Sequence, residues 1–504
     1  MLRMTSSLGW RLALGLLGGA LVPLGFAPFD WWPLGVLGVA LHYLSLVGSR
    51  PREAGWLGFV FGVGLFGVGV SWIYVSIHDY GAAPPPLAAL ITFGFVLLLA
   101  SYQALQCYLW RRWCADRLPA WTFAASWLLV ESWRGWFLTG FPWLYLGYAH
   151  VSSPLSGLAP LVGVQGLGLL VALLAAVPVQ ALLDWRAGAG RRAVLSALAP
   201  LLILLLVTVA LHGTAWTQPA QRLPLRVALV QGNIPQELKF DPAAIQAGLD
   251  RYAALTEPVW PLDLVVWPET AIPLVYQNEP ALLQSLDERA AASGTALVTG
   301  VFFRSDQGLH NSVVALGAGS GVWHKQRLVP FGEYVPLREV VSDLLALFEL
   351  PLSSLAPGSD LQQPLQVQGI GVAPFICYEV VYPEFVRTHA AEAGLLLTVS
   401  NDTWFGDSIG PHQHLQIAAM RARELGRSML RATNNGITAV IDPQGRSSAA
   451  LPQFAAAVLE AEVQVYEGLT PFARWGERPL WWLSLGFVSL LALWQYRSRV
   501  TIAT

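Results

Sequence analysis

The sequence predicts a multi-span α-helical membrane bundle joined to an α/β domain. The 504-residue chain is 54% hydrophobic and only 12% charged, whereas globular proteins average about 25% charged residues. Its first part is a series of apolar segments, each about long enough to cross a bilayer. From Leu225 onward, short apolar strands alternate with helical patterns, which is typical of an α/β domain.

Eight apolar segments have the length of a membrane span. Seven precede the α/β region and one follows it. We therefore expect a membrane domain with seven transmembrane helices at 1–215, an α/β domain at 216–478, and an eighth transmembrane helix with a short tail at 479–504. The expected spans are 8–26, 32–48, 54–77, 86–110, 119–137, 157–183, 193–215 and 479–496.

The arginines are distributed unevenly between the two sides of the predicted membrane. Twelve of them lie in alternate connecting segments or near the chain ends, against one, Arg134, in the opposite short loops. Because cytoplasmic loops are enriched in Lys and Arg, we expect both termini in the cytoplasm. Seven spans then place 216–478 outside it. The twelve are Arg3, Arg11, Arg50, Arg52, Arg111, Arg112, Arg117, Arg186, Arg191, Arg192, Arg497 and Arg499.

Two details within the predicted membrane domain bear on packing and function. Gly58 and Gly62 form a small-xxx-small pair that would let another helix pack closely. Glu131 and Arg134 lie three residues apart, so they could pair on one helix face. Two interpretations of this pair remain open: an interfacial pair at the lipid headgroups, or part of the wall of a lipid entry path, since ionisable groups at membrane depth often have a function.

The α/β domain is expected to contain apolar strands that are covered on both faces. Residues 338–365 are harder to place, because they contain the apolar stretch 344–348 within a loop-like region. That stretch could dip into lipid or pack on the core. We expect strands at 225–231, 262–267, 296–301, 311–316, 371–377, 395–400 and 436–441, and helices at 242–257, 279–293 and about 412–430.

Three residues of complementary chemistry lie at strand ends or in adjoining loops: Glu269, Lys325 and Cys377. A thiol attacks as thiolate, and a carboxylate can take its proton. An ammonium group can stabilise the oxyanion of a tetrahedral intermediate. Lys325 and Lys239 are the only two lysines beside 28 arginines, so a compact ammonium group is favoured at Lys325. Each of the three has an ordinary structural interpretation alone, but together they predict one active site.

Other classes of function have less support in the sequence. The net charge of −2 and the absence of a basic run argue against a nucleic-acid partner. The three cysteines, Cys107, Cys114 and Cys377, do not form a disulfide framework. No spacing of His and Cys is typical of a metal site, and we expect no metal and no cofactor. His412 and His414 are interpreted as ordinary polar residues on a loop.

The motifs around the three residues resemble the Glu-Lys-Cys triad of the carbon–nitrogen hydrolase (nitrilase) superfamily. They are Trp267-Pro268-Glu269-Thr270, Lys325 before Leu328-Val329-Pro330-Phe331-Gly332-Glu333, and Ile376-Cys377-Tyr378-Glu379. Together with the membrane spans, they make essentially the whole chain similar to the apolipoprotein N-acyltransferase family. Further matching stretches are 230–236, 400–406 and 431–437.

This resemblance implies an αββα sandwich attached to the membrane helices, and it implies roles for particular residues. Glu269 would be the base, Lys325 the oxyanion stabiliser and Cys377 the nucleophile. The implied supporting or substrate-binding residues are Glu333, Tyr378, Glu379, Phe240, Asn401 and Trp404. Phe240 departs from the family pattern, in which a tryptophan is expected after the lysine.

The resemblance also implies a reaction and a location. A fatty acyl chain would move from the sn-1 position of a phospholipid, typically phosphatidylethanolamine, through a cysteine thioester. The acceptor would be the α-amine of the N-terminal diacylglyceryl-cysteine of an apolipoprotein. The expected location is the bacterial inner membrane, with a periplasmic catalytic domain and a monomeric chain. Two alternatives are a membrane-bound amidase that uses water as acceptor, which the number of spans disfavours, and a transporter or scaffold with an inactive nitrilase-like domain.

Overall fold

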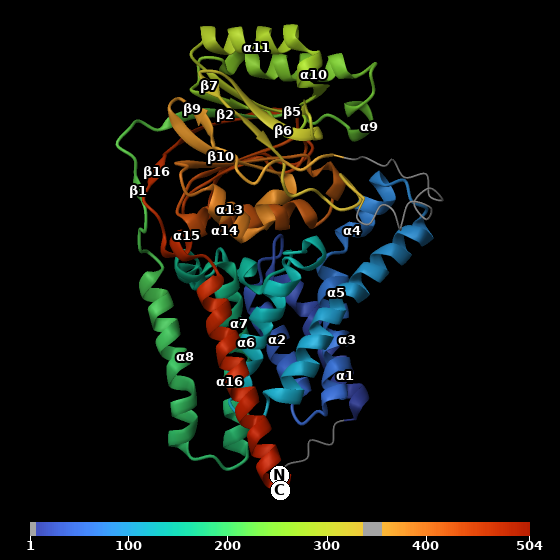
Figure 1. The fold of residues 1–504 in the computed structure, drawn as a ribbon, viewed down its shortest axis with the longest axis vertical. Helices are drawn as coiled ribbons and strands as arrows, with labels where there is room; N and C mark the ends of the chain where they lie inside the picture. Colours follow the sequence, from blue (N-terminus) through green and yellow to red (C-terminus); the bar gives the residue numbers. More distant parts are fainter. Residues whose placement is uncertain (1–6, 336–354, 504) are drawn as a thin grey trace. The chain divides into compact units, whose positions relative to one another are not determined.

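The structure, a computed structural model, describes residues 7–335 and 355–503, with side chains as far as residue 497. The chain separates into two compact units. The first contains the residues up to Thr214 together with those from Trp475 onward, and the second is Ala215–Arg474. Figure 1 shows the first unit as helices coloured blue to green plus the red helix at the C-terminal end of the chain. The α/β region therefore lies between two segments of the helical unit in sequence.

The first unit is helical, and a helix begins in or near each of the eight predicted spans. Several helices are joined by single turns, as at 22–25 after the first helix. The helices are α1 (Leu8–Leu21), α2 (Trp32–Leu46), α3 (Pro51–Gly69), α4 (Trp72–Val75), α5 (Pro85–Trp113), α6 (Pro119–Arg134), α7 (Ala159–Arg186), α8 (Arg191–Leu211) and α16 (Arg478–Ala503).

Not all of these helices have the length and apolar character of a membrane span. In the described ranges, four do: 8–25, 85–113, 154–186 and 191–211. A fifth is obtained if Pro51–Gly69 and Trp72–Tyr80, which meet at a bend of 56°, are counted as one span. The 15-residue α2 is about 22 Å long at 1.5 Å per residue, shorter than a hydrocarbon core of about 30 Å. The count of eight spans therefore stays a prediction.

Contacts inside the helical unit explain the glycine pair and the Glu131–Arg134 pair noted in the sequence. A side chain at Gly58 or Gly62 would collide with α5, so these glycines permit the close packing of α3 on α5 that their spacing predicts. Glu131 and Arg134 are both only 2% exposed. Arg134 donates to the backbone carbonyls of Phe141 and Trp143, each at 2.6 Å. The carboxylate of Glu131 accepts from a backbone N–H of the same loop at 3.1 Å. Both residues therefore hold this loop inside the unit.

The second unit contains two large mixed sheets. In the first, the strand order is β15-β2-β3-β5-β6-β8, and β4 pairs with β5. In the second it is β14-β13-β12-β11-β10-β9-β7. The first sheet comprises β2 (Leu225–Gln231), β3 (Leu264–Val266), β4 (Ile272–Val275), β5 (Ala296–Ser305), β6 (Gly308–Gly317), β8 (Val322–His324) and β15 (Ala457–Val463). The second comprises β7 (Gly319–Ser320), β9 (Leu365–Val367), β10 (Ile370–Ile376), β11 (Leu395–Ser400), β12 (Met429–Thr433), β13 (Ala439–Ile441) and β14 (Ser447–Ala450). A short pair, β1 (Gln218–Pro219) with β16 (Tyr466–Glu467), stands apart from both.

The two sheets stack between layers of helices, as Figure 1 shows. Helices α10 (Ile245–Thr256) and α11 (Pro280–Ala292) cover the first sheet, and α13 (Pro383–His389) and α14 (Gly410–Leu425) cover the second. Central strands such as β3 and β11 are buried along their whole length. This explains their mostly apolar sequences, because a strand covered on both faces needs no polar alternation. The expected αββα sandwich is confirmed.

Two sequence-based assignments in this unit are wrong. The helix expected at about 412–430 ends at Leu425, because Gly426 adopts a left-handed conformation with φ +61° and terminates it. Residues 429–433 then form β12 in the second sheet. The expected loop position of His412 and His414 is also wrong, since both lie on α14. Strand β15 was not predicted, although it pairs along all of β2. The apolar stretch 344–348 lies outside the described residues.

Candidate active site

Cys377 lies immediately after β10, at a sharp change of backbone direction. Its φ is +52°, in the left-handed region that a residue with a side chain seldom adopts. The single-turn helix Cys377–Val381 begins here. The carboxylate of Glu379 accepts a hydrogen bond from the backbone N–H of Ile376 at 2.8 Å and so closes the turn. Unfavourable backbone conformations of this kind persist where the surrounding structure enforces them, and they concentrate at active sites.

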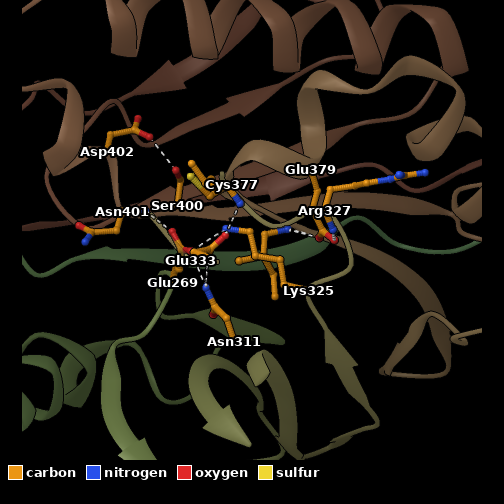
Figure 2. A network of polar contacts seen from close by, with 12 residues as sticks. Glu269, Asn311, Lys325, Arg327, Glu333, Cys377, Glu379, Ser400, Asn401 and Asp402 are labelled. Atoms are coloured by element: carbon orange, nitrogen blue, oxygen red, sulfur yellow. Dashed lines mark hydrogen bonds and ion pairs between the residues drawn. The ribbon is translucent and has the colours of Figure 1, made fainter. Parts of the chain in front are cut away.

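Four polar residues from the first sheet and its loops, all buried except the partly exposed Glu333, form a group that we call the carboxylate–lysine cluster: Glu269, Asn311, Lys325 and Glu333. The Lys325 Nζ lies 2.8 Å from Glu333 Oε1 and 3.4 Å from Glu269 Oε1. Asn311 on β6 donates to the same two carboxylates, at 2.8 Å and 3.1 Å. Figure 2 shows these side chains beside Cys377. Residues 64 positions apart in sequence thus share one hydrogen-bonded cluster.

The cluster keeps its carboxylate ionised and its lysine charged. Burial raises the pKa of Glu269, but the charges of Lys325 and Lys239 and hydrogen bonds from Asn311 and Asn401 outweigh burial and hold the pKa below its ordinary value. Burial lowers the pKa of Lys325, and the charges of Glu333 and Glu269 more than offset this, so the pKa lies well above the ordinary value. Near neutral pH, Glu269 is therefore a proton acceptor and Lys325 a fixed positive charge.

Cys377 is a thiol in the resting site. Burial and the negative charge of Glu269 raise its pKa well above the ordinary value, while Lys325 acts in the opposite direction. The thiol must therefore lose its proton during attack rather than before it. An ionised carboxylate and a neutral thiol are a suitable pair for general-base activation of a nucleophile.

Glu379 links the backbone of Cys377 to the loop that follows Lys325. Besides the N–H of Ile376, it accepts from the backbone N–H groups of Gln326 at 2.6 Å and Arg327 at 3.2 Å. Burial raises its pKa to about 7, against these hydrogen bonds and the charge of Lys325, which lower it. One carboxylate thus fixes the separation between the segment that carries Lys325 and the segment that carries the thiol (Figure 2).

The other predicted supporting residues differ in how close they lie to this centre. The backbone N–H of Asn401 donates to Glu269 Oε2 at 2.7 Å. The ring of Tyr378 packs on Tyr382, with ring centroids 5.4 Å apart. Phe240 and Trp404 are 48% and 41% exposed. The structure therefore brings Glu333, Glu379 and Asn401 to the centre and leaves the two aromatic rings at the surface.

A second buried group, which we call the anchoring cluster, lies on the second sheet and α14: Ser400, Asp402, His414 and Arg431. Asp402 pairs with Arg431 at 2.5 Å and accepts from Ser400 at 2.6 Å. His414 Nε2 lies 3.2 Å from the carbonyl oxygen of Cys377. Since a carbonyl only accepts, Nε2 carries the proton. Burial and Arg431 lower the pKa of His414, although Asp402 acts to raise it. The Nδ1 of His414 lies 3.1 Å from both the Asp402 carboxylate and the Arg431 guanidinium.

Several of these residues were missed by sequence reasoning. His414 was interpreted as an ordinary polar residue, yet its side chain is fully buried and holds the backbone of Cys377. Asn311 was assigned only to a strand. Lys239 was noted as a second lysine and as the residue before Phe240, without a role, but its Nζ donates to the backbone carbonyl of Glu269 at 2.9 Å. The rarity of lysine in the chain was a usable signal for Lys239. The consecutive polar residues His310, Asn311 and Ser312 on β6 gave only a weak signal for Asn311.

Comparison with known proteins matches both parts of the chain to family models. Residues 18–177 match the apolipoprotein N-acyltransferase N-terminal domain. Residues 226–470 match the carbon–nitrogen hydrolase family. A carbon–nitrogen hydrolase superfamily protein from Xanthomonas campestris, known from its crystal structure, is similar at 21% identity over 48% of this chain and 91% of its own, with a TM-score of 0.37.

Full-length relatives carry one common name, apolipoprotein N-acyltransferase. The protein from Azotobacter vinelandii is 51% identical, covering 96% of this chain and 95% of its own. That from Pseudomonas aeruginosa PAO1 is 47% identical, covering 99% and 98%, and that from Photobacterium profundum is 39% identical, covering 96% and 95%. Identity at this level over nearly the full length of both chains shows that this chain belongs to the apolipoprotein N-acyltransferase family.

Proposed function

We propose that this membrane acyltransferase moves a fatty acyl chain from the sn-1 position of a phospholipid to the α-amine of the N-terminal diacylglyceryl-cysteine of an apolipoprotein. The observation that carries the proposal is Cys377 on its constrained turn, beside an ionised buried Glu269 and a buried, charged Lys325. The family's name favours this reaction over hydrolysis by a membrane-bound amidase. Phosphatidylethanolamine is the proposed donor.

In the first half-reaction, the thiol proton of Cys377 passes to Glu269 as the sulfur attacks the ester carbonyl of the phospholipid. The negative charge that develops on the carbonyl oxygen is stabilised by the ammonium group of Lys325. When the intermediate collapses, the carbon–oxygen bond of the ester breaks. The lysophospholipid oxygen then takes the proton from Glu269, and Cys377 is left as an acyl thioester.

In the second half-reaction, the α-amine of the lipoprotein attacks the thioester carbonyl. Glu269 accepts a proton from the attacking nitrogen, and Lys325 again faces the oxyanion. The carbon–sulfur bond breaks, and the proton returns through Glu269 to the sulfur of Cys377. Glu333 holds Lys325 in place throughout, because it forms the shorter of the two ion pairs of that lysine. A thioester retains enough reactivity for an amine to attack.

Intact-protein mass spectrometry tests the thioester directly. With phosphatidylethanolamine alone, the wild-type protein should gain the mass of one fatty acyl chain, and hydroxylamine at neutral pH should remove it. A peptide that begins with diacylglyceryl-cysteine should discharge the adduct and become N-acylated. Cys377→Ser should form no labile adduct, because an alcohol is a far weaker nucleophile near neutral pH. Turnover by Cys377→Ser equal to that of the wild type would contradict a covalent route through this residue.

We also propose a location in the bacterial inner membrane as a monomer, with both termini cytoplasmic and residues 216–478 periplasmic. The asymmetric arginines support this orientation. Two single-cysteine additions in a Cys377→Ser background test the orientation. Gln307→Cys changes an exposed turn of the second unit, and Ala187→Cys changes the segment between α7 and α8. In cells with a permeable outer membrane, an impermeant maleimide should label only the first variant. Labelling of Ala187→Cys alone would reverse the orientation.

A further inference from the structure

Lys239 is a buried cation on an otherwise exposed turn. It ends the one-turn helix α9 (Gln236–Lys239) and is 5% exposed, although its neighbours Leu238 and Phe240 are 44% and 48% exposed. Its Nζ donates to the backbone carbonyl of Glu269 at 2.9 Å. The chain contains only two lysines, and both place their ammonium groups on Glu269, Lys325 on the side chain and Lys239 on the backbone.

The two lysines differ in how their charge is balanced. Lys325 forms ion pairs with two carboxylates. In the described part of the chain, the ammonium group of Lys239 makes one hydrogen bond, to a neutral carbonyl, and forms no ion pair. The charged or titratable groups that act on it are Glu269 and Cys377. A buried ammonium group without a paired carboxylate is costly, so it is expected only where it has a function or an electrostatic partner at longer range.

The carboxylate–lysine cluster supplies that partner. Glu269 and Glu333 together carry two negative charges, and Lys325 carries one positive charge, so the cluster has one negative charge in excess. A further negative charge develops at the sulfur of Cys377 or on the substrate carbonyl when the thiol attacks. A second cation at Glu269 balances the excess charge and keeps Glu269 ionised and able to accept the thiol proton.

We propose that Lys239 is a positioning residue of the active site, which holds the backbone of Glu269 and provides the second positive charge that keeps its carboxylate ionised. The inference rests on the proposed function, since it concerns the base of that reaction. Lys239 acts through Glu269 and does not itself exchange a proton with the substrate. The charge of Lys239 is one of the causes that lower the pKa of Glu269.

The surroundings of Lys239 limit the pH range in which it can play this part. A small cavity of about 10 Å³ lies beside it, lined mainly by apolar residues such as Ile234, Ile245 and Ala271. Burial lowers the pKa of Lys239 to about 8, although the charges of Glu269 and Cys377 act to raise it. The ammonium form therefore predominates below about pH 8 and is lost above it. Acylation should accordingly decline on the alkaline side as this charge disappears.

The test is the pH profile of the first half-reaction, measured as the initial rate of adduct formation with phosphatidylethanolamine vesicles and no acceptor. Lys239→Met removes the charge, and Lys239→Arg keeps it at every accessible pH. Glu237→Gln, an exposed charge change on the same helix, is the matched control. The acidic limb is the part of the pH profile in which the rate falls as the pH is lowered. In Lys239→Met this limb should shift to higher pH by about 1 unit, because the pKa of Glu269 rises when a neighbouring cation is lost. Lys239→Arg should keep the acidic limb and lose the decline above pH 8.

The possible outcomes separate the two proposals. If the wild-type protein forms no adduct, the proposed function fails. If it forms one, and folded Lys239→Met has the acidic limb of the wild type, the inference about Lys239 is wrong. The inference is equally wrong if Lys239→Arg has the same profile as Lys239→Met, since then the charge has no part. If Lys239→Met does not fold, the inference is tested by the rates of Lys239→Arg above pH 8. A decline in rate identical to that of the wild type then rejects the inference.

Discussion

The two buried polar clusters on either side of Cys377 have similar residue types but different pairing. In the carboxylate–lysine cluster, one ammonium group is shared between two carboxylates, at 2.8 Å and 3.4 Å, and one of these, Glu333, retains 15% side-chain exposure. In the anchoring cluster, Asp402 and Arg431 are fully buried and pair directly. A third member, His414, binds the backbone of Cys377 rather than its side chain.

This difference in pairing indicates that the two clusters have different roles. A carboxylate whose charge is only partly balanced can change its protonation state during a reaction, as the proposed role of Glu269 requires. A carboxylate held by a buried guanidinium, as Asp402 is, has a pKa well below its ordinary value despite burial, which raises it. Such a group stays ionised throughout and serves as a fixed support. We therefore expect substitutions in the first cluster to change rates and pH profiles, and substitutions in the second to change stability.

The largest effect is expected at Lys325. Lys325→Met should still fold, but it should form the acyl adduct at least about 10²–10³-fold more slowly, the scale of losing one oxyanion donor. Adduct formation with phosphatidylethanolamine vesicles, followed by mass spectrometry, gives the rate. Thermal unfolding in the same detergent provides the control. A rate near that of the wild type would remove Lys325 from the mechanism.

The next effect concerns stability and belongs to the anchoring cluster. Asp402→Asn leaves the guanidinium of Arg431 buried without its carboxylate, so the free energy of unfolding should fall by about 3–5 kcal/mol. The double variant Asp402→Asn with Arg431→Met removes both charges and should recover part of this loss. Unfolding in denaturant measures both. Equal stability of Asp402→Asn and wild type would show that this pair does not anchor the turn.

A smaller effect is expected at Asn311, which donates to Glu269. In Asn311→Leu the ionised carboxylate loses one hydrogen bond, so the pKa of Glu269 should rise. Because Glu269 accepts a proton only when ionised, the acidic limb of the acylation rate should move to higher pH, with the loss largest at low pH. Rates at high pH should stay close to those of the wild type. A uniform loss at every pH would instead indicate a structural role.

The smallest effect is expected at Phe240, which lies outside both clusters. The family resemblance led us to expect a tryptophan at this position; the exposed ring of Phe240 lies 6.3 Å from that of Phe302. Phe240→Trp adds an indole N–H at the surface and should change the acylation rate by no more than about threefold. Rates with donors of different acyl length provide the measurement. A change of tenfold or more in the acylation rate would show that this ring contacts the lipid in the rate-determining step.

Local patterns were sufficient for most of the second unit. Strands β2 and β11 have the bounds expected from the sequence, because mostly apolar runs are typical of strands covered on both faces. Boundaries set by one residue were harder to predict. The end of α14 depends on the left-handed conformation of Gly426. Strand β15 has alternating rather than continuous apolar residues, and it became recognisable only through its pairing with β2.

By itself, the sequence determined the fold class, the two-part organisation and the three residues that we propose for catalysis. These follow from hydrophobic runs and from motifs of a few adjacent residues, which are local properties. Only the tertiary structure decided which polar residues support them. Lys239, His414 and Arg431 make side-chain and backbone contacts with residues 17 to 37 positions away in sequence. No local pattern specifies such contacts, because burial and charge pairing arise only when the two sheets stack and bring their strand ends together.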